Sequence, residues 1–225
     1  MKRLALAFAA GSLAIAGCSV PALAEEPGNA PTPKRIAKEG AGLKTAIFAG
    51  GCFWGIEGVF SHVKGVKSAV SGYHGGSAAT ASYNRINQGG TNHAEAVKIT
   101  YDPYVIRYDE LLQIFFSVAT DPTQRNRQGP DVGSQYRSAL VPLNAEQRAV
   151  AKAYLAQMAS SGVWKGSIAT RIESPRKFYR AESYHQDYMV KNPRSGYIVR
   201  WDKPKVAALK RMFPSDYSAS FLRDG

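Results

Sequence analysis

Cys52 has the sequence surroundings of a reactive thiol. It follows two glycines in residues 49–55 (AGGCFWG), and a strand-like apolar run over residues 45–48 precedes them. A helical period begins at Ile56, so the glycines permit a tight strand-to-helix turn that places Cys52 in the first helical turn. Backbone N–H groups and the helix dipole favour a thiolate there, which is the nucleophilic form of cysteine. The alternative is a buried cysteine packed among core aromatics.

A carboxyl group is predicted in a second apolar setting, near the start of a strand over residues 94–101. Side chains alternate along a strand, so Glu95 shares a face with Val97 and Ile99, which must be the buried side. Desolvation raises the pKa of a carboxyl, so Glu95 can hold a proton near neutral pH and act as an acid. The alternative is a glutamate at a strand end that reaches solvent or a lysine.

The rest of the pattern predicts one α+β domain in which helices pack on one face of a mixed sheet. Two polar loops, over residues 77–92 and 120–134, carry Tyr83 and Asp131, and Tyr136 follows the second loop. Long loops in compact domains tend to carry function. Beyond Pro175 no period is clear, which predicts a coil-rich C-terminal extension with a basic tail from about residue 199. Further strands are predicted over 66–73, 136–141 and 167–172, and helices over 108–118 and 144–158.

The first 24 residues predict an export signal. Lys2 and Arg3 precede an apolar run over residues 4–16, which is typical of a secretory signal and too short for a membrane span. Processing is expected either before Cys18, which would be lipidated and attach the protein to a membrane, or after Ala24. Residues 25–43, rich in Pro, Gly and Ala, predict a flexible linker before a catalytic domain over 44–225. The protein is therefore expected in the periplasm, free or membrane-anchored.

Cysteine count and charge limit the function further. The chain has two cysteines, and processing removes or caps Cys18, so Cys52 is the thiol left in the mature domain and no internal disulfide is expected. The formal net charge is +12, but the basic residues are scattered. Export and the lack of an organised basic face argue against nucleic-acid binding.

Five short motifs occur in order along the chain: Gly51-Cys52-Phe53-Trp54-Gly55, His93-Ala94-Glu95-Ala96-Val97, Asp121-Pro122-Thr123, Gln135-Tyr136-Arg137-Ser138 and Tyr184-His185-Gln186. Together they resemble the peptide methionine sulfoxide reductase A family. The resemblance covers about residues 44–197 and implies a ferredoxin-like two-layer sandwich that reduces the S-epimer of methionine sulfoxide, free or in proteins. It implies no metal or bound cofactor, and a monomer is expected. The external reductant would be a thioredoxin-like protein or a small thiol.

The resemblance also implies a role for each matching residue. Cys52 would attack the sulfoxide sulfur and become a sulfenic acid, and Glu95 would protonate the sulfoxide oxygen. Tyr83 and Tyr136 would hydrogen-bond that oxygen, and Asp131 would help to order the polar site. The aromatic walls that hold the S-methyl group would come from Phe53 and Trp54. This division is chemically sound, because a sulfoxide becomes a good electrophile only when its oxygen gains a proton or strong donors.

The sequence departs from the family pattern at the regeneration step. Many members have a resolving cysteine after a C-terminal Gly-Tyr pair, whereas Ile198 follows Gly196 and Tyr197 here and no later cysteine exists. Thr120 and Pro130 replace a common histidine and asparagine, which are smaller loop variations. A one-cysteine cycle with an outside thiol is therefore expected.

Two other classes of protein are kept as alternatives. A cysteine hydrolase or acyltransferase would pair Cys52 with a histidine base held by Asp or Asn. A non-enzymatic envelope lipoprotein would bind methionine sulfoxide in an aromatic slot without turnover. The candidate bases are His62, His74, His93 and His185.

Overall fold

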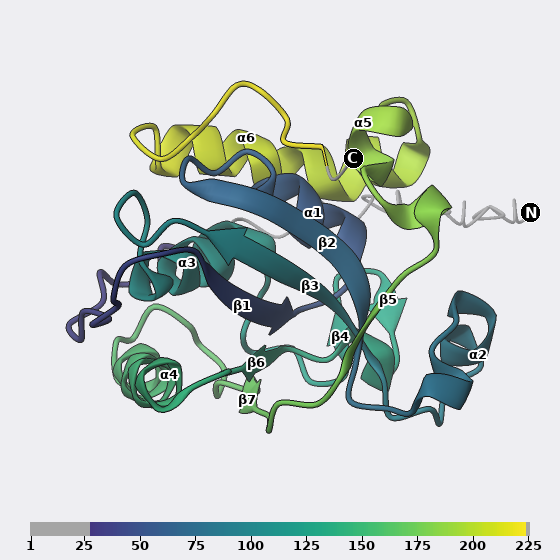
Figure 1. The fold of residues 1–225 in the computed structure, drawn as a ribbon, viewed down its shortest axis with the longest axis horizontal. Helices are drawn as coiled ribbons and strands as arrows, with labels where there is room; N and C mark the ends of the chain where they lie inside the picture. Colours follow the sequence, from purple (N-terminus) through teal and green to yellow (C-terminus); the bar gives the residue numbers. More distant parts are fainter. Residues whose placement is uncertain (1–27, 224–225) are drawn as a thin grey trace, which may run out of the picture.

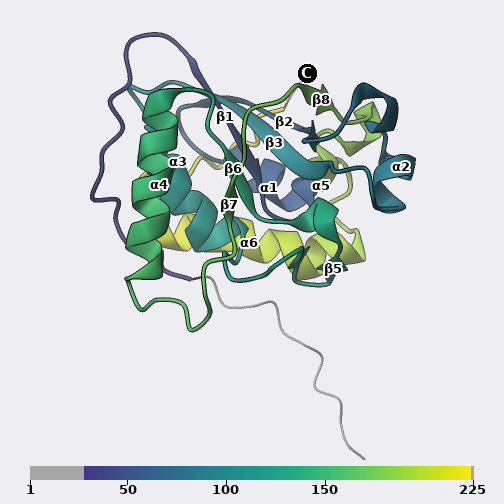
Figure 2. The ribbon, with the colours of Figure 1, turned by 90° about the horizontal axis from the view of Figure 1, so that it is seen from below.

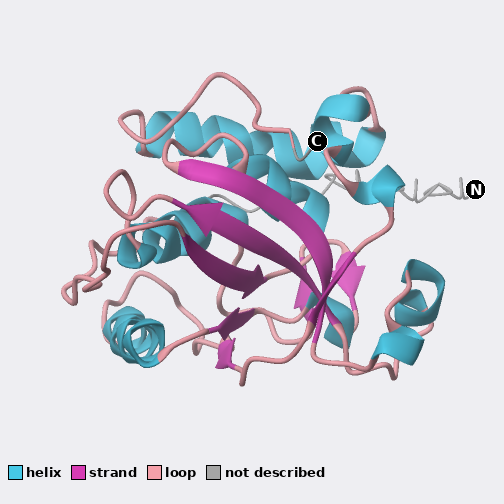
Figure 3. Cartoon of the chain, viewed as in Figure 1, coloured by secondary structure: helices cyan, strands magenta, loops and turns pink. Residues whose placement is uncertain are grey.

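The computed structural model describes residues 28–223 and places six strands in one mixed sheet, in the order β7-β6-β1-β3-β2-β8 (Figures 1 and 3). The predicted export signal and its two processing sites lie outside the described residues. The strands of the sheet are β1 (Lys44–Ala49), β2 (Val66–His74), β3 (Ala94–Tyr101), β6 (Ala139–Val141), β7 (Arg171–Ile172) and β8 (Phe178–Arg180), and a separate hairpin pairs β4 (Arg127–Gln128) with β5 (Asp131–Val132). The α-helices are α1 (Phe53–Phe60), α2 (Tyr83–Asn87), α3 (Tyr108–Ile114), α4 (Ala145–Ala159), α5 (Tyr188–Lys191) and α6 (Lys203–Met212).

Helices cover one face of the sheet, as the sequence predicts (Figure 2). β3 pairs antiparallel with both β1 and β2, and within residues 28–223 the β6–β7 pair is the parallel one of this sheet. Phe48 of β1 and Val97 of β3 are paired in register and turn to the helix layer, where Phe48 packs 5.0 Å from the ring of Phe115. Small side chains such as Ala96 and Ala139 form a second, thinner cluster with no aromatic residue among its fully buried members. The larger, helix-side core therefore contains Phe48, Val97 and Phe115.

The predicted elements agree best where the sequence period is strong. β3 has the predicted bounds, and α4 begins and ends one residue after the helix predicted over 144–158. The helix predicted over 108–118 is α3 followed by one π-helical turn, Phe115–Ala119. The strands predicted over 136–141 and 167–172 are shorter, and Ser134–Tyr136 forms a 3-10 turn instead.

Residues 28–43, the described part of the predicted linker, pack against the domain. The prediction of a flexible linker is therefore wrong for these residues. Ala30 and Ala37 are buried, because their small side chains fit close to the helices. The backbone N–H of Ala37 donates to Asp109 of α3 at 2.9 Å, and the Tyr154 hydroxyl of α4 donates to the Pro31 carbonyl at 2.7 Å. Side chains distant in sequence thus satisfy the backbone of a segment that has no regular structure of its own.

The C-terminal extension is more helical than the predicted coil. A π-helical turn, Ile198–Asp202, leads directly into α6, whose Ala208 and Leu209 are fully buried. α6 lies against α1 (Figure 1). Gly55 of α1 leaves the space that Asp202 occupies, since a Cβ on Gly55 would lie 2.3 Å from the Asp202 carboxylate. Basic residues of the predicted tail, such as Lys203 and Lys210, are exposed on this helix. Among the described residues, no helix has both the length and the apolar character to cross a membrane.

Candidate active site

Cys52 caps the N-terminus of α1, one residue after the turn that the two glycines form. Gly51 has φ of 103°, and a Cβ there would lie 2.6 Å from the side chain of Gln128. A Cβ on Gly50 would meet Phe115 and Thr120 at 2.8 Å. Both glycines are therefore required by close packing, and Gly51 also by its backbone conformation. The side chain of Cys52 is 8% exposed after this turn. Cys52 is the free cysteine among residues 28–223.

Glu95 lies on the helix-facing side of β3, as alternation predicts, and is 1% exposed. Its Oε2 accepts a hydrogen bond of 3.0 Å from the backbone N–H of Phe53, the residue that follows Cys52. Burial raises the pKa of Glu95 to about 8, and the nearby charges of Asp131 and Asp202 act in the same direction against the Phe53 hydrogen bond. Glu95 is therefore mostly protonated at neutral pH and can donate a proton.

The resting thiol of Cys52 is not the thiolate that its place at a helix N-terminus predicts. Burial raises the pKa of Cys52 well above its ordinary value, and the charges of Glu95 and Asp202 raise it further. The backbone N–H of Trp54 lowers the pKa but does not outweigh these effects. The prediction fails because the helix-terminus effect is modest, whereas desolvation among acidic groups is large.

Two phenols face the same site. Tyr83 begins α2, and its backbone N–H donates to Glu182 at 2.9 Å, which fixes the start of this short helix. Tyr136 ends the 3-10 turn before β6. Burial raises the pKa of both phenols, and the charges of Glu95 and Cys52 raise them further, so both hydroxyls stay protonated. Two neutral O–H donors therefore accompany the carboxylic acid.

The aromatic wall depends on a histidine that the sequence analysis assigned no role in substrate binding. Phe53 is fully buried, and the indole of Trp54 stacks on Tyr188 with ring centres 3.7 Å apart. The Trp54 Nε1–H donates to Nδ1 of His185 at 3.1 Å. The His185 ring also lies 5.0 Å from the ring of Phe53 and 4.4 Å from that of Tyr83. The motif Tyr184-His185-Gln186 was the signal that could have identified it.

The C-terminal segment closes the site with two acids. Asp131 of β5 accepts a hydrogen bond from the Tyr197 hydroxyl, and burial raises the pKa of Asp131 despite that bond. Asp202 is fully buried at the start of α6, where its Oδ1 lies 3.3 Å from Nζ of Lys205. Burial also raises the pKa of Asp202, which is one of the charges that act on Cys52. Sequence reasoning missed Tyr197 and Asp202, since the segment that holds them has little period.

Similarity to known proteins agrees with this arrangement. A model of the family described as peptide methionine sulfoxide reductase matches residues 44–216. A relative named "Peptide methionine sulfoxide reductase MsrA 2", from Mesorhizobium japonicum, is 52% identical over 181 residues, 80% of this chain and 93% of the relative. The chain belongs to the peptide methionine sulfoxide reductase A family. It is accordingly an oxidoreductase that reduces methionine sulfoxide.

Other members of the family support the same assignment. A Deinococcus radiodurans protein named "Peptide methionine sulfoxide reductase MsrA" is 47% identical over 182 residues, 81% of this chain and 88% of the relative. The reduced form of Mxr1 from Saccharomyces cerevisiae has a TM-score of 0.61 at 36% identity, covering 72% of this chain and 92% of its own. Methionine sulfoxide reductase A of Corynebacterium diphtheriae has a TM-score of 0.57 at 32% identity, covering 76% and 88% of the two chains.

The hydrolase alternative finds no support in the positions of the histidines. In this reductase, each histidine is hydrogen-bonded to a group other than the Cys52 thiol, and none stands as a base beside it among residues 28–223. The same range holds no group of three or more His, Cys, Asp or Glu residues that could bind a metal ion. The histidine contacts are His62 with the Ser218 carbonyl, His74 with the Arg176 amide, His93 with the Ser77 carbonyl and His185 with the Trp54 indole.

Cys52 also borders a cavity of about 760 Å³. The loop over residues 117–131, the loop around Trp164 and the inner side of α6 line it. The acid, the phenols and the predicted aromatic walls are absent from this lining, which consists of described residues only. Asp131 and Tyr197 belong both to the site and to this lining, so the cavity adjoins the polar group around Glu95 and meets it at Cys52.

Proposed function

We propose that the protein reduces the S-epimer of methionine sulfoxide, free or within proteins, through a sulfenic acid on Cys52. The observation that supports this most strongly is the buried Glu95, which binds the amide next to Cys52 and has a pKa of about 8. Sulfoxide reduction requires a nucleophilic sulfur and a nearby proton donor, and the Cys52 thiol and the protonated Glu95 are these two groups.

In the proposed first step, the sulfur of Cys52 attacks the sulfoxide sulfur while Glu95 gives a proton to the sulfoxide oxygen. Hydrogen bonds from Tyr83 and Tyr136 stabilise the charge on that oxygen. A bond forms between the two sulfurs, and the oxygen then moves to the Cys52 sulfur as this S–S bond and the substrate S–O bond break. Methionine leaves, Cys52 becomes a sulfenic acid, and the proton of the thiol restores Glu95. The substrate sulfur is reduced by two electrons and Cys52 is oxidised by two. Phe53 and Trp54 supply an apolar slot that accepts the S-methyl group.

The proposed second step needs a thiol from outside the molecule. Cys52 is the free cysteine of the described residues, and Ile198 follows Tyr197 where many family members have a resolving thiol. An external thiol would displace water from the sulfenic acid to form a mixed disulfide, and a second thiol would release Cys52. The cycle is thus of the one-cysteine type.

We also propose that the enzyme is exported and repairs oxidised proteins of the cell envelope. The support is the sequence of residues 1–24, with its basic start, its apolar run and its processing sites around Cys18 and Ala24. The mass of the intact mature protein, isolated from its host envelope, distinguishes a lipidated Cys18 from cleavage after Ala24.

A single-turnover experiment tests the proposed chemistry. The protein is mixed with excess S-epimer and no thiol, and methionine is quantified while a dimedone-type reagent traps sulfenic acid. We expect about one equivalent of methionine per protein, a trapped adduct on Cys52 and no product from the R-epimer. Cys52→Ser, which changes one atom, should fold and form neither product. Repeated turnover without thiol, or a disulfide between Cys52 and Cys18, would contradict the one-cysteine cycle.

A further inference from the structure

We propose that the cavity beside Cys52 binds the reducing thiol, and that this thiol is a small anionic molecule whose carboxylates Lys165 and Arg211 hold. This inference rests on the proposed one-cysteine cycle and adds the place and the chemical class of the reductant. Cys52 and both cations line the same cavity of about 760 Å³. Such a volume is typical of sites for small molecules.

The cations of this cavity are free to meet a ligand. Lys165 and Arg211 are exposed, and neither forms an ion pair or side-chain hydrogen bond within residues 28–223. A third cation, Lys205, lies 3.3 Å from Asp202 and is already partnered.

The two carboxylates in the lining are, in contrast, already bonded. Asp131 accepts the Tyr197 hydroxyl, and Asp121 accepts the Thr123 hydroxyl at 2.7 Å. These bonds come from neutral hydroxyls and leave both carboxylates charged, so the lining has three cationic side chains against two anionic ones. The formal excess is one positive charge, and the two unpaired cations are the groups that an anionic ligand can meet.

The remaining walls suit the carbon skeleton of a small thiol. Trp164 and Trp201 line the cavity, and Trp201 packs 3.8 Å from the position of a Cβ on Gly129. Gly28 contacts the Trp164 indole, where a Cβ would lie 2.9 Å from Nε1, and helps to close that wall. Two indoles with cations near them offer apolar contact and charge to the same ligand.

The position of the cavity fits the second half of the cycle. Glu95, Tyr83 and Tyr136 do not line it, so a thiol in the cavity approaches Cys52 from outside the group that handles the sulfoxide oxygen. The thiolate forms an S–S bond to Cys52 while the sulfenic S–O bond breaks, and the hydroxyl leaves as water with one proton. A second thiolate then forms the free disulfide and releases Cys52, so two thiols supply the two electrons.

A double-mixing experiment with thiols of different charge tests the inference. The Cys52 sulfenic acid is first formed with dimethyl sulfoxide, which is small and neutral, and then mixed with mercaptosuccinate, 3-mercaptopropionate, 2-mercaptoethanol or cysteamine. Each rate is divided by the rate of the same thiol with a neutral small disulfide, which corrects for intrinsic reactivity. We expect the corrected rate to rise with negative charge and this preference to weaken as salt is added.

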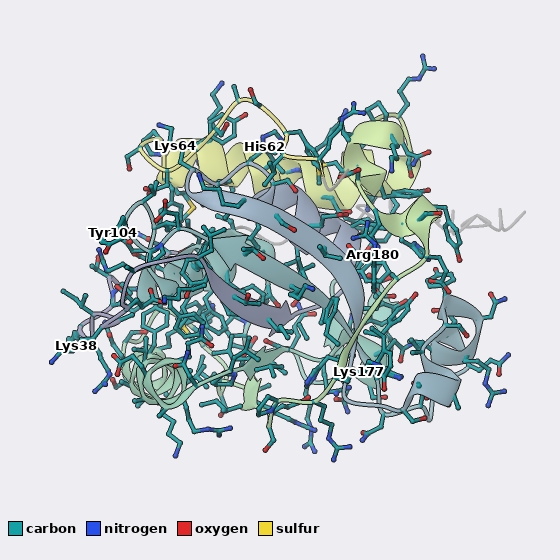
Figure 4. The ribbon with its side chains drawn as sticks, viewed as in Figure 1. Lys38, His62, Lys64, Tyr104, Lys177 and Arg180 are labelled. Carbon is teal, nitrogen blue, oxygen red and sulfur yellow. The ribbon has the colours of Figure 1, made fainter. Side chains whose placement is uncertain are left out.

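Variants locate the preference in the cavity. Lys165→Gln with Arg211→Gln should lower the corrected rate of mercaptosuccinate by roughly threefold to tenfold, the range for two partly solvated ion pairs. The rate of 2-mercaptoethanol should not change. Lys38→Gln with Lys177→Gln is the matched control, because it removes the same charge and neither lysine lines the cavity. Both lysines are exposed and are labelled in Figure 4.

Three results would overturn the inference. The first is a set of corrected rates independent of thiol charge, and the second is an equal loss in the control variant. The third is a slower first step with dimethyl sulfoxide in Lys165→Gln with Arg211→Gln, which would assign the cavity to the sulfoxide. Failure of the proposed function is distinct, because no sulfenic acid would then form before any thiol is added.

Discussion

The carboxyl of Glu95 and the backbone amide of Phe53 are joined by a hydrogen bond of 3.0 Å, which ties the acid of β3 to the residue after the nucleophile. The bond links two elements, β3 and α1, that meet only in the folded domain. It fixes Glu95 next to the Cys52 turn while leaving its second oxygen, Oε1, for a substrate. Glu95 is therefore preorganised, because its side chain need not change conformation before it transfers a proton.

Glu95→Gln should slow the reductive step by a factor on the order of 10²–10⁴, the usual contribution of a positioned acid. Binding should weaken much less, since glutamine keeps the shape and the bond to Phe53. The wild-type rate at saturating sulfoxide should fall as pH rises through about 8, where Glu95 loses its proton. Rapid-quench measurement of methionine at several pH values checks both points. A variant rate near that of the wild type would place the acid elsewhere.

Glu95→Gln should slow the reaction, but at higher pH it should raise the stability of the fold relative to the wild type. The folded pKa of Glu95, about 8, is above its ordinary value of 4.5, so its contribution to stability is greatest below 4.5 and is lost as pH rises to about 8. The loss approaches about 1.4 kcal/mol per pH unit within that window. Urea unfolding should therefore show that the free energy of unfolding of Glu95→Gln increases relative to that of the wild type as pH rises.

The control for this measurement is Glu146→Gln. Glu146 has a lowered pKa, because the Lys38 amide and Arg35 bind its carboxylate. Its charge state is therefore constant across most of the same window. The plot of unfolding free energy against pH for Glu146→Gln should be parallel to that of the wild type. A parallel curve for Glu95→Gln would contradict the raised pKa.

Tyr83→Phe and Tyr136→Phe should each slow the reductive step modestly, since the other phenol still donates to the sulfoxide oxygen. The rate of the reductive step in the double variant should fall by a factor of about 10²–10³, which is typical of removing a preorganised hydrogen-bond donor. Single-turnover rates check the comparison, with Tyr104→Phe as control. Tyr104 is 78% exposed at the end of the sheet opposite α2 (Figures 1 and 4). A double variant no slower than either single one would refute the shared role.

Asp202→Asn should lower the pKa of the Cys52 thiol, because it removes one of the charges that raise it. It also frees Lys205, whose positive charge then favours the thiolate. The pH dependence of thiolate ultraviolet absorbance, or of alkylation by iodoacetamide, measures the shift. Asp216→Asn is the control, since Asp216 belongs to the segment after α6 and does not act on Cys52. An unchanged titration in Asp202→Asn would show that Asp202 does not contribute to the raised pKa of Cys52.

Much of the fold and the centre of the site could be predicted from the sequence because the signals are local. Alternation over β3 places Glu95 on the buried face, and two glycines before a helical period place Cys52 at the start of α1. Such patterns require only the geometry of one element. They need no knowledge of what packs against it.

The failures concern properties that arise only between distant segments. Burial raises the pKa of the Cys52 thiol, and the charges of Glu95 and Asp202 raise it further, although Asp202 is 150 positions further along the chain. Likewise, His185 reaches Trp54 across 131 positions. The segment over 28–43 is ordered by partners on α3 and α4 that its own composition does not reveal.

The C-terminal segment gives the site a dependence on chain completion. Tyr197, Trp201 and Asp202 all lie beyond residue 196, yet they border the environment of Cys52. A chain interrupted before them would have the nucleophile, the acid and both phenols but no wall on the α6 side. Its thiol would be open to solvent and to overoxidation beyond the sulfenic acid. Synthesis therefore supplies the nucleophile early and the residues that cover it last.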